Sequence, residues 1–212
     1  MMKDKKKGVL LDLDGTLWDS SGAVVKAWNE ILEKHGIEPL SDEDMKRVMG
    51  LSMNRIADIL FPDLDPKKRY ALMRECELHE NEYIRRHGGT LFEGVPALLE
   101  QLSHNYFTAI ISNCQKGYIE AFIQYYGLGK YIDATRAYGD LQKEKDENIQ
   151  DVIKENDLGS AVYVGDIYND YVCAQKAEVP FILAAYGFGP FDHEPRAESV
   201  EEVFAIVQEV LE

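Results

Sequence analysis

The chain has 212 residues, of which 45% are hydrophobic and 29% charged, and its formal net charge is −15. This balance is that of an ordinary soluble protein, long enough for a sizeable core with one smaller insert. The negative charge argues against binding to nucleic acid or to an anionic membrane surface, and no apolar run approaches the ~20 residues of a membrane span, so we expect a cytoplasmic protein.

The first elements in chain order are a strand and a series of helices. Residues 7–11 form a short apolar run that predicts a buried parallel strand. Apolar residues at helical spacing then predict a helix over 23–35. Ser41 is a candidate N-cap for a second helix ending near residue 50, a short third helix is expected before residue 62, and Pro66 fits the first turn of a long helix reaching about residue 86. We therefore expect an all-helical insert over residues 18–88.

From residue 89 onward, short apolar runs alternate with helical patterns. Predicted strands lie at 107–111, 132–138, 161–164 and 181–185, and predicted helices at 95–102, 118–126, 147–155 and 201–211. Strands alternating with helices indicate an α/β fold with a doubly wound parallel sheet. The expected core domain comprises residues 1–17 and 89–212, with residues 18–88 inserted after the first strand.

Three of the predicted strands end in polar residues. These are Asp12 and Asp14 after the first strand, Ser112 and Asn113 after the second, and Asp166 after the fourth, with Asp170 four residues later. Ligand sites of open α/β sheets lie at the carboxyl ends of strands, where these groups could converge. Neighbouring acids repel each other unless a cation or a proton intervenes, so the pattern indicates a metal site or a nucleophile beside a proton carrier. Mg²⁺ prefers oxygen ligands, for which Asp12, Asp166 and a backbone carbonyl near Asp14 are suitable.

These motifs resemble those of the haloacid dehalogenase-like hydrolases. Asp12-Leu13-Asp14-Gly15-Thr16 is similar to the first motif of the family, Ser112-Asn113 to the second, Lys143 or Lys145 to the third, and Gly165–Asp170 to the fourth. The order and spacing fit, and the resemblance covers essentially the whole chain. The helical insert resembles the small cap domain of the subgroup that holds phosphoglycolate phosphatases and β-phosphoglucomutase-like enzymes.

The resemblance implies a role for each acid. Asp12 would be the nucleophile that forms an aspartyl-phosphate and would also bind Mg²⁺. Asp14 would protonate the leaving oxygen and then deprotonate the attacking water, while its backbone carbonyl helps to bind the metal. Asp166 would be a metal ligand, and Asp170 would support the metal site without binding the metal itself.

The resemblance also implies the phosphate contacts. Ser112 and the backbone N–H of Asn113 would bind phosphoryl oxygens, and a lysine would neutralise charge shared by nucleophile and phosphate. Many relatives have a lysine followed by proline at this motif, whereas some have Lys-Gly-Glu-Asn-Ile. Residues 145–149 match the second pattern better, so Lys145 is favoured as the motif's lysine. Lys143 is then expected to be a solvent-exposed loop residue. Thr16 and, from the insert, Arg55 are candidate substrate contacts; a surface arginine is an equally good interpretation of Arg55.

The leading hypothesis is a Mg²⁺-dependent phosphatase acting on a small phosphorylated metabolite, as a monomer or small homo-oligomer. A phosphosugar mutase of the same family is the first alternative; such mutases tend to carry a histidine before the equivalent of Ala27-Trp28, where this chain has none. A dehalogenase is disfavoured because that subgroup needs neither Mg²⁺ nor Asp14. A non-catalytic relative that binds a phospho-ligand is the remaining alternative, and the intact set of acids speaks against it.

Overall fold

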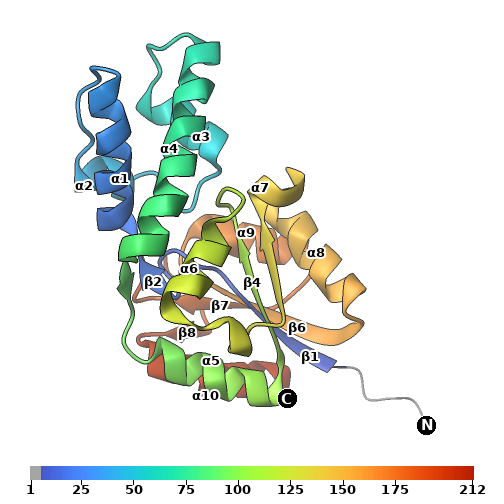
Figure 1. The fold of residues 1–212 in the computed structure, drawn as a ribbon. Coiled ribbons are helices and arrows are strands. Elements are labelled where there is room, and N and C mark those ends of the chain that lie inside the picture. The colour runs from blue at the N-terminus through green and yellow to red at the C-terminus, as the bar shows by residue number, and fades with distance from the viewer. Residues whose placement is uncertain (1–5) are drawn as a thin grey trace.

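A six-stranded parallel sheet runs through the computed structural model, which describes residues 6–212 (Figure 1). Its strands are β1 (Lys6–Leu11), β4 (Phe107–Ser112), β5 (Ala134–Ala137), β6 (Leu158–Gly165), β7 (Phe181–Ala184) and β8 (Arg196–Ala197). Their order is β5-β4-β1-β6-β7-β8. After β1, the chain adds β4 and β5 on one side of it and then β6, β7 and β8 on the other side. Such a reversal of strand order marks the crevice where α/β sheets bind ligands. The predicted α/β fold is confirmed.

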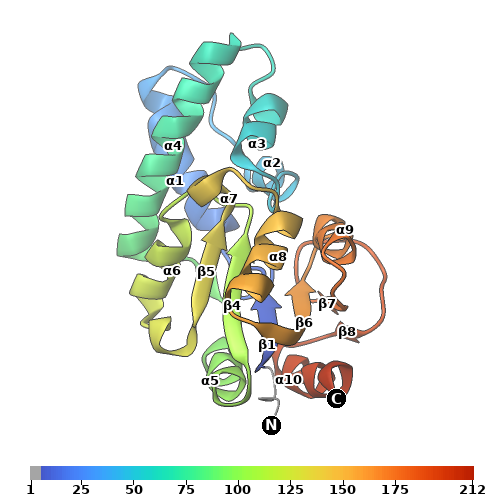
Figure 2. The ribbon, with the colours of Figure 1, turned by 90° about the vertical axis from the view of Figure 1, so that its right-hand side faces the viewer.

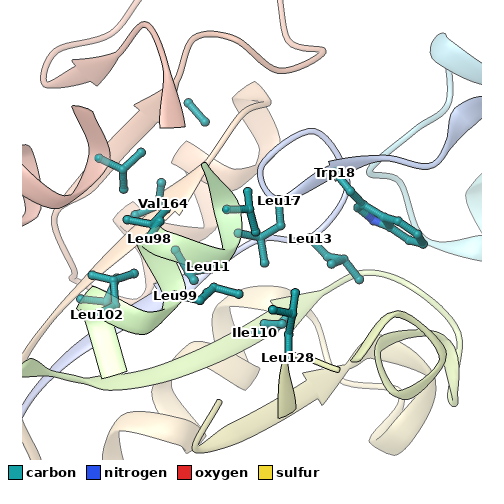
Figure 3. Packing of buried hydrophobic residues seen from close by; sticks show 14 of the residues in the cluster. Leu11, Leu13, Leu17, Trp18, Leu98, Leu99, Leu102, Ile110, Leu128 and Val164 are labelled. Carbon is teal, nitrogen blue, oxygen red and sulfur yellow. The ribbon is translucent and has the colours of Figure 1, made fainter. Parts of the chain in front are cut away.

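Helices cover both faces of this sheet (Figure 2). On one face lie α5 (Val95–Asn105), α6 (Tyr118–Tyr126) and α10 (Val200–Leu211), and on the other α8 (Lys145–Glu155) and α9 (Tyr168–Lys176). Short pieces η1 (Gly129–Tyr131) and α7 (Tyr138–Leu141) flank β5. Because side chains alternate along a strand, Val9 and Leu11 of β1 join the first hydrophobic cluster and Leu10 the second. Figure 3 shows Leu11 packed with leucines of α5 and Ile110 of β4.

The remaining helices form a separate layer next to the carboxyl end of β1 (Figure 1). These are α1 (Ser21–Lys34), α2 (Asp42–Lys46), α3 (Met53–Leu60) and α4 (Pro66–His87), and they bury a hydrophobic cluster of their own. We call this layer of four helices, residues 21–87, the cap; the sequence predicted an insert over residues 18–88. Two short antiparallel strands connect the cap to the sheet. The chain enters the cap through β2 (Trp18–Asp19) and leaves it through β3 (Thr90–Leu91).

Local sequence signals explain several of these boundaries. The Ser41 side chain accepts a hydrogen bond from the Asp44 amide in a capping box, and Asp65 caps α4 with Pro66 in its first turn. The sequence did not predict β2, β3 or α9. Only Asp170, Cys173 and Ala174 of α9 are buried, so that helix lacks a clear apolar stripe. Within residues 6–212, no helix is both long and apolar enough to cross a membrane.

Candidate active site

Asp12 lies where β1 ends, and its backbone amide continues the ladder by donating to the carbonyl of Val164 in β6, 2.8 Å away. The turn that follows depends on Gly15, whose φ of +82° favours glycine. A Cβ on Gly15 would lie 2.0 Å from Oδ2 of Asp166. Glycine at this position therefore both makes the turn and lets the end of β6 approach the end of β1.

Lys145 connects the acids at the centre of the site. Its Nζ donates to Oδ1 of Asp12 at 2.9 Å and to Oδ1 of Asp170 at 2.5 Å, and the lysine is only 1% exposed. Burial opposes the lysine charge, but the Asp12 and Asp170 carboxylates outweigh it and raise the pKa of Lys145. Lys143 instead pairs with Asp151 near the surface. Of the two candidate lysines, the structure thus brings only Lys145 to Asp12.

Asp170 fixes the loop that carries Asp166, and Asp166 in turn fixes the loop at Phe188. Oδ2 of Asp170 accepts hydrogen bonds from the backbone amides of Asp166 and Ile167 at 3.1 and 3.2 Å. Oδ2 of Asp166 accepts one from the amide of Phe188 at 2.7 Å, in a loop where a Cβ on Gly187 would lie 2.3 Å from Cβ of Asp166. The other oxygen of Asp166, Oδ1, is buried and has no partner among the described residues.

This arrangement fits a divalent cation. Carboxylate oxygens of Asp12, Asp166 and Asp170 lie within 4.8 Å of one another. Burial, followed by the charge of Asp170, raises the pKa of Asp12 to about 7, and burial with both neighbouring acids raises the pKa of Asp166 well above its usual value. A cation would relieve this repulsion. Because Lys145 and two backbone amides engage both oxygens of Asp170, Asp12 and the unpartnered oxygen of Asp166 are the better-suited ligands.

Asp14 is held apart from this cluster by hydroxyl groups. Its Oδ1 accepts hydrogen bonds from Ser20 Oγ at 2.6 Å and from Tyr118 OH at 2.8 Å. Burial raises the pKa of Asp14, although both hydrogen bonds act in the opposite direction. A carboxyl group that is buried, fixed in orientation and easier to protonate than usual is suited to transferring a proton.

Two predicted phosphate contacts lie beside Asp14. Ser112 ends β4 with its hydroxyl buried, where it accepts a weak hydrogen bond from the Cys114 amide at 3.3 Å. The Asn113 side chain reaches across to the cap and donates to the carbonyl of Gly50 at 2.9 Å. Ser112 and Asn113 thus lie at the boundary between the sheet and the cap.

The other two predicted substrate contacts lie outside the cavity next to Asp14. The Thr16 hydroxyl is buried without a partner among the described residues, while the Thr16 carbonyl accepts a hydrogen bond from Tyr186. Arg55 is exposed on α3, although its neighbours Met53 and Ile56 line the cavity. The structure therefore does not bring Arg55 to the site.

A cavity of about 30 Å³, room for one or two waters, separates Asp14 from the cap. It is lined by Asp14, Val24, Trp28, Met45, Met49, Gly50, Leu51, Met53, Ile56, Glu80, Ser112, Asn113, Cys114, Gln115 and Tyr118. The sequence reasoning did not single out Glu80, Gln115 or Tyr118 as site residues. For Glu80 a signal existed, because it lies between Cys76 and Ile84 at four-residue spacing on the buried side of α4.

Known proteins similar to this chain include haloacid dehalogenase-like hydrolases and phosphoglycolate phosphatases. The family model of the haloacid dehalogenase-like hydrolases matches residues 9–184. A phosphoglycolate phosphatase of Xanthomonas campestris is 25% identical over 89% of this chain and 87% of its own length, and one of Rhodobacter capsulatus is 26% identical over 93% and 94%. A haloacid dehalogenase-like hydrolase from Streptococcus pneumoniae has the same fold, with a TM-score of 0.81 at 19% identity over 97% of this chain and 99% of its own.

Proposed function

Since the chain is a phosphatase that belongs to the haloacid dehalogenase-like hydrolases, we propose that it hydrolyses a small phosphorylated metabolite by way of a phosphoryl group carried on Asp12. The observation that carries this proposal is the buried contact of Lys145 with Asp12 and Asp170, beside the unpartnered oxygen of Asp166. Such a site holds a reactive carboxylate, a cation to receive an anionic phosphate, and a place for a metal.

In the first half of the reaction, a carboxylate oxygen of Asp12 attacks phosphorus while the bond from phosphorus to the leaving alcohol breaks. Asp14 donates its proton to the leaving oxygen, which its raised pKa favours. In the second half, Asp14 takes a proton from water as the water oxygen attacks phosphorus, and the bond between phosphorus and Asp12 breaks. Splitting the hydrolysis in this way replaces one difficult step by two easier ones.

The other residues position the phosphate. The Ser112 hydroxyl and the Asn113 amide bind phosphoryl oxygens, and Lys145 compensates the charge shared by phosphate and Asp12. Mg²⁺ bound by Asp12, Asp166 and the backbone carbonyl of Asp14 would supply the remaining positive charge that an anionic substrate needs near these acids. Because the cavity holds only one or two waters, the cap must open to admit substrate and close again to exclude solvent.

The proposal is tested with the purified protein, Mg²⁺ and a panel of phosphate monoesters that includes p-nitrophenyl phosphate. We expect phosphate release that stops in excess EDTA and falls by at least about a thousandfold in Asp12→Asn. Asp63→Asn, an exposed carboxylate removed from the cap surface, serves as the matched control and should retain full activity. Undiminished hydrolysis by a folded Asp12→Asn variant, or in EDTA, would overturn the proposed chemistry.

A further inference from the structure

The cavity between Asp14 and the cap adjoins the place where the proposed reaction puts the leaving group. In that reaction, Lys145 and Ser112 hold the phosphate, and the ester oxygen faces Asp14, which protonates it. Asp14 and Ser112 line the core end of the cavity, and residues of α1, α3 and α4 line the cap end. The chemistry of the cap end therefore decides which alcohol the enzyme accepts.

Most of the cap end is apolar, and its one ionisable group is a carboxyl. Trp28 comes from α1, Met53 and Ile56 come from α3, and Glu80 comes from α4. None of the cavity-lining residues, within the part of the chain that the structure describes, is a lysine, arginine or histidine. A substrate whose leaving group carries a carboxylate would find no cation in this cavity to pair with.

Glu80 is buried, being only 3% exposed, and is held by neutral groups. Trp28 Nε1 donates to its Oε2 at 2.5 Å. The Gln115 amide beside it donates to Oδ1 of Asn81 at 3.1 Å, and Asn81 in turn donates to the carbonyl of Lys116. Trp28 thus orients the Glu80 carboxyl from within the cap, the bond between Gln115 and Asn81 joins core to cap beside it, and none of the described residues that line the cavity offers Glu80 a positive charge.

Building on the proposed function, we propose that Glu80 selects phosphate monoesters whose leaving alcohol bears a hydroxyl or ammonium group and rejects those bearing a second anion. A hydroxyl or ammonium group donates a hydrogen bond to the Glu80 carboxyl, whereas a carboxylate in this apolar cavity meets a like charge or an unfavourable desolvation. Two-carbon esters show the contrast, because phosphoglycolate ends in a carboxylate, 2-hydroxyethyl phosphate in a hydroxyl and 2-aminoethyl phosphate in an ammonium group.

The experiment measures kcat/KM for these three esters of matched size, and each ester as a competitor of p-nitrophenyl phosphate hydrolysis. We expect the hydroxyl or the ammonium ester, or both, to exceed phosphoglycolate by at least about tenfold in the wild type. In Glu80→Gln, which keeps an oxygen for Trp28 but cannot ionise, this ratio should shrink by several fold when it is measured at about pH 9, above the Glu80 pKa of about 8. Glu75→Gln, an exposed residue of the same helix, should leave the ratio unchanged.

Several results would overturn the inference. One is a wild-type kcat/KM for phosphoglycolate that equals or exceeds the values for the other two esters. A second is a ratio of these values that Glu80→Gln does not alter. A third is that none of the three esters reacts or competes with p-nitrophenyl phosphate. In each case, continued Asp12-dependent hydrolysis of p-nitrophenyl phosphate leaves the proposed phosphatase function standing. Loss of every hydrolysis, including that of p-nitrophenyl phosphate, counts against the proposed function itself.

Discussion

The core and the cap balance their buried acids in opposite ways. On the core side, Asp12 and Asp170 share the ammonium group of Lys145. On the cap side, Glu80 has only neutral donors, and burial raises its pKa to about 8. The core side is therefore ready to receive an anion together with a metal, whereas the cap side is not. We therefore expect opposite charge preferences for the two parts of a substrate, with an anion favoured in the core and disfavoured beside Glu80.

Removing the core cation should have the largest effect on this contrast. In Lys145→Met, two buried carboxylates lose their partner, and we expect a loss of about 3–5 kcal/mol in the free energy of unfolding, together with loss of phosphatase activity. Urea unfolding followed by circular dichroism measures the stability. Lys143→Met, which breaks only the surface pair with Asp151, is the matched control and should unfold like the wild type.

A double variant isolates the contact between Lys145 and Asp12. In Asp12→Asn with Lys145→Met, the acid and its cation leave together, so part of the stability lost in Lys145→Met should return. If the two substitutions instead lower the stability additively, the buried contact between Lys145 and Asp12 is not the balanced pair described above.

Removing the cap acid should change the stability with a characteristic pH dependence. Folding raises the pKa of Glu80 from 4.5 to about 8, so the native state binds its proton more tightly than the unfolded state. This contribution to stability is fully present below pH 4.5 and is lost as the pH rises toward 8, by at most about 1.4 kcal/mol per pH unit. Glu80→Gln should remove that decline, so that the variant gains on the wild type as pH rises.

Urea unfolding of both proteins across this pH range checks the sign. Glu43→Gln, at an exposed position of the cap, provides the matched control and should follow the wild-type curve. If the unfolding free energies of the wild type and Glu80→Gln change in parallel from acid to alkaline pH, then Glu80 is not a buried acid without a cationic partner, as inferred for the cap side.

The smallest effect is expected from the hydroxyl that orients Asp14. Because the hydrogen bond from Tyr118 lowers the pKa of Asp14, Tyr118→Phe should raise that pKa further and shift the alkaline limb of the kcat profile to higher pH. The shift should correspond to about 0.5–1.5 kcal/mol, the contribution of one hydrogen bond. Tyr126→Phe, which loses a hydroxyl bonded to the Gly89 carbonyl instead, is the control. If the alkaline limb of the kcat profile does not move in Tyr118→Phe, then Asp14 is not the group that transfers the proton.

Much of the core side could be predicted from the sequence because its signals are local. Asp12 and Asp14 directly follow an apolar run, and parallel strands bring their ends to the same edge. The strand order around β1 then places Asp166 and Asp170 near Asp12, as the 4.8 Å cluster shows. The preference for Lys145 over Lys143 rested on the residues that follow it, and the structure does bring Lys145 to Asp12.

The cap side could not be predicted in the same way, since it depends on how two separately packed layers meet. Asn113 of the core reaches Gly50 of the cap across 63 positions of sequence, and Gln115 reaches Asn81 across 34. No local pattern gives the orientation of α1 and α4 relative to the sheet, which the two-residue strands β2 and β3 help to set. The same reason explains why Arg55, a plausible anion contact by its charge, lies on the exposed side of α3.

The central claim, that Asp12 carries the phosphoryl group, is tested most directly by trapping. The enzyme is quenched in acid while it turns over a phosphate monoester with Mg²⁺, then digested and analysed by mass spectrometry. We predict one added phosphoryl group on the peptide that contains Asp12, with none in Asp12→Asn. Continued turnover with a phosphoryl group on another residue, or with none on any peptide under conditions that preserve acyl phosphates, would contradict the claim.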